Sequence, residues 1–202
     1  MGKVTGLLLA ITLLSYCATP STKQDKNNTY DSLQIVLEEV LILDQEGREK
    51  GWGWEKIMEA DRKNLLIVTA ILDQYGWIDS SNIGTKASEA LFYVIQHADL
   101  EYQEKYYPMF QESVDQGASS MVHYAMMTDR ILMRKGKKQR FGTQGSSGNL
   151  RQGSAEMLIW PIENPAIVNE LRKEVGLELT VEENAARLGA EYDPKEKLPA
   201  EY

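Results

Sequence analysis

Apolar side chains recur three and four residues apart along most of the chain, a spacing typical of amphipathic α-helices. The first such stretch begins near Asp31, a residue type that can cap a helix, and carries Leu33, Leu37 and Val40 on one face. Glycine, asparagine or proline residues separate the later stretches, as expected where helices end or begin. We expect further helices at about 55–75, 87–95, 100–116, 119–135, 165–175 and 181–188.

Local signals support several of these helices. Asp99, Asn164 and Thr180 each precede one of the stretches as an N-cap residue, and Glu183 can complete a capping box with Thr180. Pro108 lies inside another stretch, where its ring and its missing N–H predict a kink or a break.

The pattern changes between residues 137 and 162. Two short stretches, 137–144 and 156–162, flank a loop rich in glycine, serine and asparagine, and together they predict a β-hairpin. The sequence therefore predicts a mainly α fold. We expect a single helical domain at 31–190, with about six to seven helices and a small hairpin at about 137–162, followed by a charged tail at 191–202.

The N-terminal segment is typical of an export signal. Lys3 precedes an apolar run at residues 4–14, too short for a membrane span of about 20 residues but suited to a signal peptide. The sequence Leu14-Ser15-Tyr16-Cys17 resembles a bacterial lipobox, although Tyr16 stands where a small residue is usual. We expect a signal peptide at 1–17, lipidation of Cys17 at the outer membrane or cell surface, and a polar tether at 18–30; simple secretion is the alternative.

Composition narrows the classes of function. The chain has 202 residues and a net charge of −8, which argues against a nucleic-acid binder because phosphates attract basic surfaces. One cysteine and two histidines exclude a disulfide framework and a zinc site built mainly from thiolates or imidazoles. We expect no cofactor, and membrane contact only through the lipid anchor; the oligomeric state stays open.

Three ionisable residues interrupt apolar helix faces. Asp44, His97 and Asp129 each continue a stripe of apolar positions. Burying an unpaired carboxylate costs several kcal/mol, so we expect these side chains to meet one another. Arg48 lies one turn beyond Asp44 and can pair with it, and Arg130 can border the same cavity. The alternative is a structural network that only holds helices together.

Residues 139–144 add neutral hydrogen-bonding groups. In a strand, Gln139 and Thr143 would share one face and Gly142 and Gln144 the other. A glycine in a strand often marks the close approach of a ligand or another backbone, and amide and hydroxyl groups suit polar ligands. The alternative is an ordinary exposed hairpin.

These residues also carry a resemblance. The segments Gln96-His97-Ala98-Asp99, Asp129-Arg130 and 136–144 resemble the motifs QHAD, DR and G-x-x-Q-x-[YF]-G-T-Q of an uncharacterised bacterial family known as a domain of unknown function. Phe141 stands where tyrosine is commoner in that pattern. The resemblance spans about residues 33–189 and implies no activity, but it implies that these polar positions, with Gln96 and Asp99 among them, form one site.

Two functions from different classes follow. The first is an envelope-anchored binding module whose His/Asp/Arg/Gln pocket takes a polar small molecule or peptide. The second is a hydrolase or group-transfer enzyme in which His97 is the general base or acid, oriented by Asp129 or Asp44, while Arg130 stabilises negative charge. A metal on Asp44, His97 and Asp129 is a weaker version of the enzyme, and a purely structural or partner-binding lipoprotein is the remaining alternative.

The sequence leaves the position and role of three aromatic residues open. Trp52 and Trp54, flanked by glycines, can form an aromatic wall for a ligand or can fill gaps between helices. His123 lies off the main apolar stripe of its helix, and we expect it at the surface or at the edge of the core.

Overall fold

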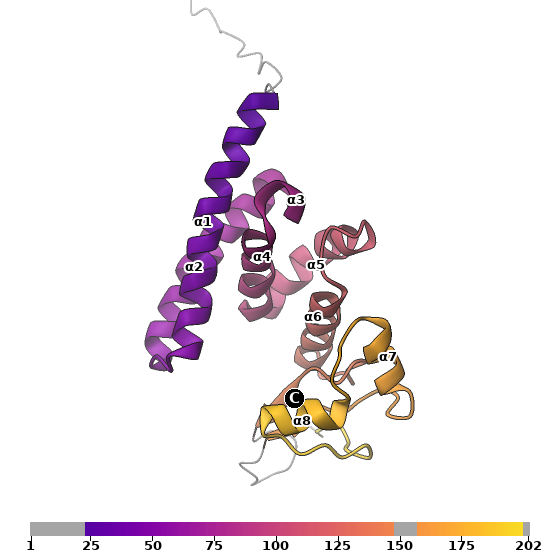
Figure 1. The fold of residues 1–202 in the computed structure, drawn as a ribbon. Coiled ribbons are helices and arrows are strands. Elements are labelled where there is room, and N and C mark those ends of the chain that lie inside the picture. Colours follow the sequence, from indigo (N-terminus) through magenta and orange to yellow (C-terminus); the bar gives the residue numbers. More distant parts are fainter. Residues whose placement is uncertain (1–22, 148–156, 200–202) are drawn as a thin grey trace, which may run out of the picture.

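The computed structural model describes residues 23–147 and 157–199, which form a mainly helical fold with one small antiparallel hairpin (Figure 1). This confirms the predicted fold class. The elements are α1 (Lys23–Glu49), α2 (Trp54–Tyr75), α3 (Ser80–Ile83), α4 (Thr85–His97), α5 (Leu100–Asp115), α6 (Met121–Arg134), β1 (Gly145–Ser147), β2 (Met157–Ile159), α7 (Val168–Glu174) and α8 (Val181–Leu188).

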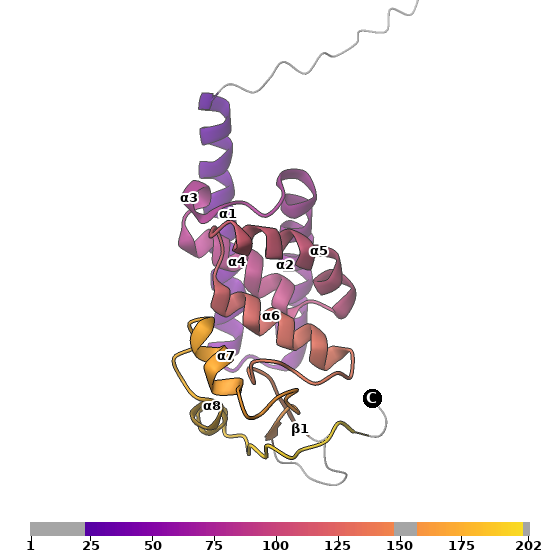
Figure 2. The same cartoon turned by 90° about the vertical axis from the view of Figure 1, so that its right-hand side faces the viewer.

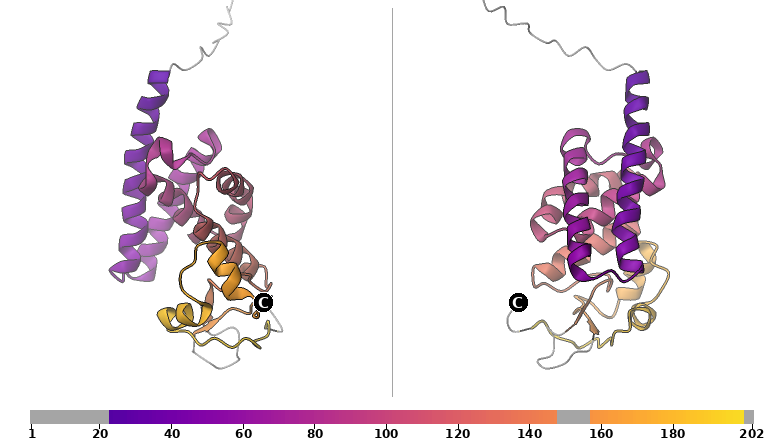
Figure 3. Two further views of the ribbon diagram at one scale, coloured as in Figure 1. Left: turned by 45° about the vertical axis from the view of Figure 1, so that its right-hand side comes forward. Right: turned by 90° about the vertical axis from the view of Figure 1, so that its left-hand side faces the viewer.

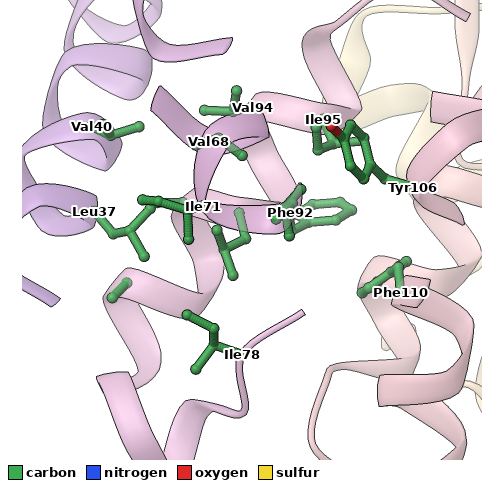
Figure 4. Close-up of a cluster of buried hydrophobic side chains, with 14 of the residues drawn as sticks. Leu37, Val40, Val68, Ile71, Ile78, Phe92, Val94, Ile95, Tyr106 and Phe110 are labelled. Carbon is green, nitrogen blue, oxygen red and sulfur yellow. The ribbon is translucent and has the colours of Figure 1, made fainter. Parts of the chain in front are cut away.

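Helix α4 forms the centre of the helical part. The α1–α2 hairpin covers one side of it, and α5 and α6 lie on the other (Figures 1 and 3). A helix that is covered on several sides needs apolar residues around most of its circumference, and α4 buries a run of them, including Phe92, Val94 and Ile95. In Figure 4, Leu37 of α1 and Phe110 of α5 approach this core from opposite directions.

The hairpin, α7 and α8 form a smaller unit at one end of the helices, next to α6 (Figure 2). Its own core contains Ile159, Ile162, Val168, Val181 and Ala185. The start of the predicted tail is attached to this unit, because the backbone of Glu191 donates to Met157 and accepts from Ile159, both at 2.9 Å.

Several predicted helix ends are confirmed. Asp99 is the N-cap residue of α5, and Thr180 with Glu183 forms the capping box at the start of α8. Gly76 and Gly189 follow α2 and α8 with positive φ angles of 75° and 64°. Glycine adopts this conformation at little cost, which explains why both helices stop there.

Helix α1 begins earlier than predicted. It starts at Lys23 and not near Asp31, so residues 23–30 of the expected tether are helical. These residues are polar and give no amphipathic signal, but a helix already nucleated by the packed residues after them extends at low cost. Tyr30 also packs against the main core, which fixes the last turn of this extension. The rest of the predicted tether, together with Cys17 and the signal peptide, lies outside the described residues.

The first predicted strand is wrong. Residues 137–144 form an irregular segment, with only an isolated bridge from Gln139 to Ile162, and the strand β1 begins at Gly145. Gly142 has a φ angle of 66°, which turns the chain where a strand would continue. The second predicted strand is confirmed over Met157–Ile159, and Gly145 pairs with Ile159 in the register.

Three smaller differences concern helices. Residues 80–83, which lie between the helices expected at 55–75 and 87–95, form the short α3, because Asp79 Oδ1 accepts from the backbone N–H of Ser81 at 2.7 Å. Helix α5 continues through Pro108, which is exposed, so that water can satisfy the carbonyl that loses its partner. Helix α7 starts at Val168, later than expected from Pro165.

The helices in the described ranges include none that is long and apolar enough to cross a membrane.

Candidate functional site

Asp44 and His97 meet where α1 packs against α4. The Nδ1 atom of His97 lies 3.1 Å from the carboxylate oxygens of Asp44. Asp44 is fully buried, whereas the His97 side chain is 22% exposed. A carboxylate partner fixes the imidazole tautomer with the proton on Nδ1. Nε2 of His97 is then the ring nitrogen left to accept or transfer a proton.

Arg48 connects this pair to a second carboxylate. Its Nη1 atom lies 3.3 Å from Asp44 Oδ1, and its Nη2 atom donates to both carboxylate oxygens of Asp61, at 3.0 and 2.9 Å. Gln45 donates to Asp44 Oδ2 at 2.6 Å. Charge-assisted hydrogen bonds of this kind offset the desolvation of a buried carboxylate. The geometry therefore holds Asp44 in place from two sides.

A cleft of about 410 Å³ opens beside His97, between α2 and α4. Its volume falls within the range of about 300–1,000 Å³ that is usual for small-molecule sites. The lining residues are Asp44, Trp54, Met58, Asp61, Arg62, Leu65, Val94, His97, Ala98, Asp99 and Arg134. Trp54 is 72% exposed, so a large aromatic surface is available at the edge of the cleft.

Mixed charge distinguishes this cleft from an ordinary apolar pocket. Arg62 and Asp99 line it with exposed side chains, and neither makes a side-chain hydrogen bond to another residue in the described ranges. Arg134 lines it too, and its guanidinium donates to the carbonyl of Ala98. The cleft thus offers both a cation and an anion to a ligand.

The structure brings together only part of the predicted site. Asp44, His97 and Asp99 line the cleft, and Arg48 contacts Asp44. The other predicted residues from α6 and the 139–144 segment are not among the lining residues. Arg130 is one of these, half-buried on α6 beside Asp129. These residues therefore do not share the lining of the cleft with His97.

Asp129 holds the segment 140–143 against α6. Its buried carboxylate accepts from the backbone N–H groups of Arg140, Phe141 and Thr143 and from the Thr143 hydroxyl, at 2.8–3.2 Å. Burial raises the pKa of Asp129, and these hydrogen bonds oppose the rise. Both carboxylate oxygens are engaged by this segment, so of the two residues expected to orient His97, Asp129 or Asp44, only Asp44 contacts it.

The glutamines form a second buried network. Gln139 Oε1 accepts from the backbone N–H of Gln144, and Gln139 Nε2 donates to the carbonyls of Gln144 and Trp160. The side-chain amides of Gln96 and Gln144 both donate to the carbonyl of Met126, each at 3.3 Å. These bonds tie α4, α6 and the hairpin together, and they satisfy backbone groups that a strand would otherwise have paired.

Gly142 is buried against side chains of the smaller unit. Its carbonyl accepts from Asn184 at 3.0 Å and from Arg172 at 3.3 Å. A Cβ atom at this position would lie 2.7 Å from Val181 Cγ2 and 3.0 Å from Ile162 Cδ1. The close approach predicted for this glycine is correct, but the neighbour is the chain's own core.

Ligand geometry does not support the metal alternative. The described residues include no group of three or more His, Cys, Asp or Glu side chains that could hold a metal ion. With Asp129 engaged by residues 140–143, the set of Asp44, His97 and Asp129 lacks its third member.

Among the charged lining residues, sequence reasoning missed Asp61 and Arg62, whereas Trp54 lines the cleft as one of its two alternatives predicted. A signal existed for Asp61. It lies seven residues before the buried Val68 and four before Leu65, on the inner face of α2. Asp61 is thus a further carboxylate on an apolar helix face, the same pattern that identified Asp44. Trp52 does not line the cleft; it packs on α1, where Gly47 leaves room for its ring.

The fold and the cleft define a mainly helical protein with a carboxylate–imidazole pair at the edge of a polar hollow. The chain belongs to a family of unknown function (DUF6624), whose family model matches residues 47–197. No curated protein and no solved structure matches the chain. The matched range contains His97 and most of the cleft, and it begins just after Asp44.

Proposed function

We propose that the cleft beside His97 binds a polar small molecule or a short peptide. The observation that carries this proposal is the contact of the buried Asp44 with Nδ1 of His97, a residue that lines a cleft of about 410 Å³. Fixing the tautomer in this way prepares a single hydrogen-bonding geometry before the ligand arrives.

The other lining groups suggest the kind of ligand. Arg62 and Asp99 favour a molecule that carries both an anionic and a cationic or hydrogen-donating group, as amino acids and short peptides do. Trp54 offers an aromatic face to a flat or apolar part of the same molecule. A purely apolar ligand would leave these charges without partners at a cost.

A second candidate function is hydrolysis or group transfer. Among the described residues that line the cleft there is no serine, threonine or cysteine, so the nucleophile in this proposal is water. His97 Nε2 removes a proton from water as its oxygen attacks the substrate, and the imidazolium then donates that proton to the leaving group. Asp44 stabilises the imidazolium, the role that the sequence had divided between Asp129 and Asp44.

The binding proposal is tested by screening amino acids, dipeptides, hydroxy acids and amino sugars by thermal shift, followed by calorimetry. Trp54→Ala and His97→Gln should weaken any interaction, because both residues line the cleft. Leu66→Ala is the control, since Leu66 is 69% exposed on the same helix as Trp54 but outside the cleft. Equal affinity of all variants would place the ligand elsewhere.

Hydrolysis is tested with the dipeptides of this panel in water enriched in oxygen-18, because their amide bond is one that water can cleave. A hydrolase incorporates the heavy oxygen into a product, and mass spectrometry detects this without knowledge of the substrate class. His97→Gln should abolish incorporation while the protein remains folded. Binding without any incorporation would support the binding module over the enzyme.

We further propose that the domain is exported and held at a bacterial envelope through a lipid on Cys17. The apolar run at 4–14 and the lipobox-like segment before Cys17 support this proposal. Labelled palmitate supplied to expressing bacteria should enter the wild-type protein but not Cys17→Ser. An unlabelled, fully processed wild-type protein would indicate simple secretion.

A further inference from the structure

A groove of about 530 Å³ runs between α1 and α4 and shares no lining residue with the cleft at His97. The two helices run in the same direction, since Gln34 lies against Gly84 at one end and Asp44 contacts His97 at the other. The lining residues of α1 extend over positions 38–49, which corresponds to about 16 Å at 1.5 Å per residue. An extended peptide advances about 3.3 Å per residue, so the groove is long enough for about five residues.

The apolar part of the groove is open to solvent. Ile42 is 60% exposed, and Leu41 and the ring of Tyr93 are half-buried. Ile35 lies seven residues before Ile42, on the same side of α1, and is 63% exposed. Exposed aliphatic side chains that continue along one helix face are typical of a surface that packs against a partner.

The rim of the groove is acidic. Its charged side chains, among the described residues, are one lysine and four glutamates, namely Lys86, Glu38, Glu46, Glu49 and Glu89. Glu46 forms an ion pair with Lys50. Glu49 and Glu89 make no side-chain hydrogen bond or ion pair to another residue in the described ranges. Both carboxylates are therefore available to a cationic partner, which they attract.

The ends of the two helices strengthen this attraction. Helix α1 ends at Glu49 and α4 ends at His97. Because the helices run in the same direction, both carboxyl ends lie at the same end of the groove. The aligned peptide dipoles give such an end about half of an elementary negative charge. The groove thus combines an apolar floor with a negative rim along its length.

We propose that the α1–α4 groove docks a basic, extended segment of another protein, in which lysine or arginine residues alternate with apolar residues. Successive side chains of an extended segment point to opposite sides. The apolar side chains pack on Leu41 and Ile42, and the long basic side chains reach back to Glu49 and Glu89 at the rim. This docking site does not depend on the function proposed for the cleft at His97.

Three fluorescent pentapeptides, with the sequences KLKLK, ELELE and KGKGK, test the proposal by fluorescence anisotropy. We expect saturable binding of KLKLK and none of ELELE. KGKGK should bind about tenfold more weakly than KLKLK, because it has lost the side chains that pack on the floor. Ile42→Ser should weaken the binding of KLKLK but not that of KGKGK. No saturable binding of KLKLK, or equal binding of KLKLK and ELELE, would overturn the proposal.

A matched pair of double variants separates docking in the groove from general attraction to an acidic protein. Glu49→Gln with Glu89→Gln removes two charges from the rim, and Glu112→Gln with Glu174→Gln removes two exposed charges elsewhere. We expect the first pair to weaken KLKLK binding about fivefold, the size of two exposed ion pairs, and the second to leave it unchanged. Equal losses would overturn the proposal.

Trp54→Ala distinguishes the groove from the other cleft. Trp54 lines the cleft at His97 and not the groove. KLKLK should therefore bind this variant as tightly as it binds the wild-type protein. A clear loss of affinity in Trp54→Ala would place the peptide in the cleft and overturn the proposal for the groove.

Discussion

The His97 imidazole and the Asp44 carboxylate are in hydrogen-bond contact across 53 residues of sequence, and Asp44 is fully buried. Only the packing of α1 on α4 brings them together. Because the carboxylate determines which ring nitrogen carries the proton, replacing the fully buried Asp44 should change the chemistry of His97 while the exposed groups of the cleft stay in place.

Asp44→Asn tests this relationship. The amide can accept at Nδ1 through its oxygen or donate through its nitrogen, so we expect a mixture of imidazole tautomers in place of one. Loss of the residue that orients a metal-binding histidine typically costs about 10- to 100-fold in affinity or activity, and we expect an effect of similar size here. Long-range ¹H–¹⁵N spectra report the tautomer of His97, and the His123 signals are the internal control. An unchanged tautomer would mean that Asp44 does not set it.

Asp129→Asn should destabilise the fold and leave the cleft intact. The new NH₂ group would face N–H donors of residues 140–143, leaving buried hydrogen-bonding groups unpaired, at a cost of about 2–4 kcal/mol. Urea unfolding measures this loss. Asp115→Asn, at an exposed position at the end of α5, should cost less than about 0.5 kcal/mol.

The opposite result would also be informative. An Asp129→Asn protein with wild-type stability but no ligand binding would show that Asp129 belongs to the functional site, as the sequence predicts.

Gly142→Ala should cost more than an ordinary glycine substitution. The φ angle of 66° disfavours any L residue, and the added Cβ lies 2.7 Å from Val181 Cγ2. Strain and overpacking together predict a loss of about 2–4 kcal/mol in the free energy of unfolding. Gly189→Ala has a similar φ angle of 64° with no atom within 4 Å of the new Cβ, so it should cost only about 1–2 kcal/mol. Equal losses would exclude the packing contribution.

His123 should make stability depend on pH. Burial lowers the pKa of His123 in the folded chain to about 4, whereas an unfolded histidine titrates near 6.5. Between these values the unfolded chain binds a proton that the folded chain does not, so stability is complete above pH 6.5 and falls as the pH falls toward 4. The expected contribution is about 3 kcal/mol.

The measurement compares urea unfolding of wild type and His123→Phe between pH 7 and pH 4. His123 stacks on Phe92 with ring centroids 3.9 Å apart. Phenylalanine keeps a flat ring in this place but cannot bind a proton, so the variant should lose less stability over this range. Parallel curves for the two proteins would show that His123 does not carry the effect.

The sequence was most informative where a helix has one apolar face and a local end signal. Helix α2 and the capping box of α8 are such cases, and both were predicted closely. The N-terminal turns of α1 were missed because they are polar on all sides. The strand predicted at 137–144 failed because its backbone groups are paired with the side chains of Asp129 and Gln139, and alternation along a sequence does not reveal such partners.

The candidate site was predicted in part for a related reason. An acidic residue on an apolar face indicates burial and the need for a partner, but it does not say which partner. Asp44 contacts His97 and Arg48, whereas Asp129 accepts hydrogen bonds from backbone N–H groups of residues 140–143. The same sequence signal, an acidic residue on an apolar helix face, therefore belongs to a cleft at Asp44 and to a fold-stabilising contact at Asp129.

Helix α1 is continuous from Lys23 to Glu49 and carries Asp44 near its far end. At 1.5 Å per residue, the 21 steps from Lys23 to Asp44 correspond to about 30 Å of rigid rod. The orientation of the His97 cleft is therefore tied to the orientation of the Lys23 end of this helix. A force or a rotation applied at that end is transmitted along the rod to the carboxylate that holds the imidazole.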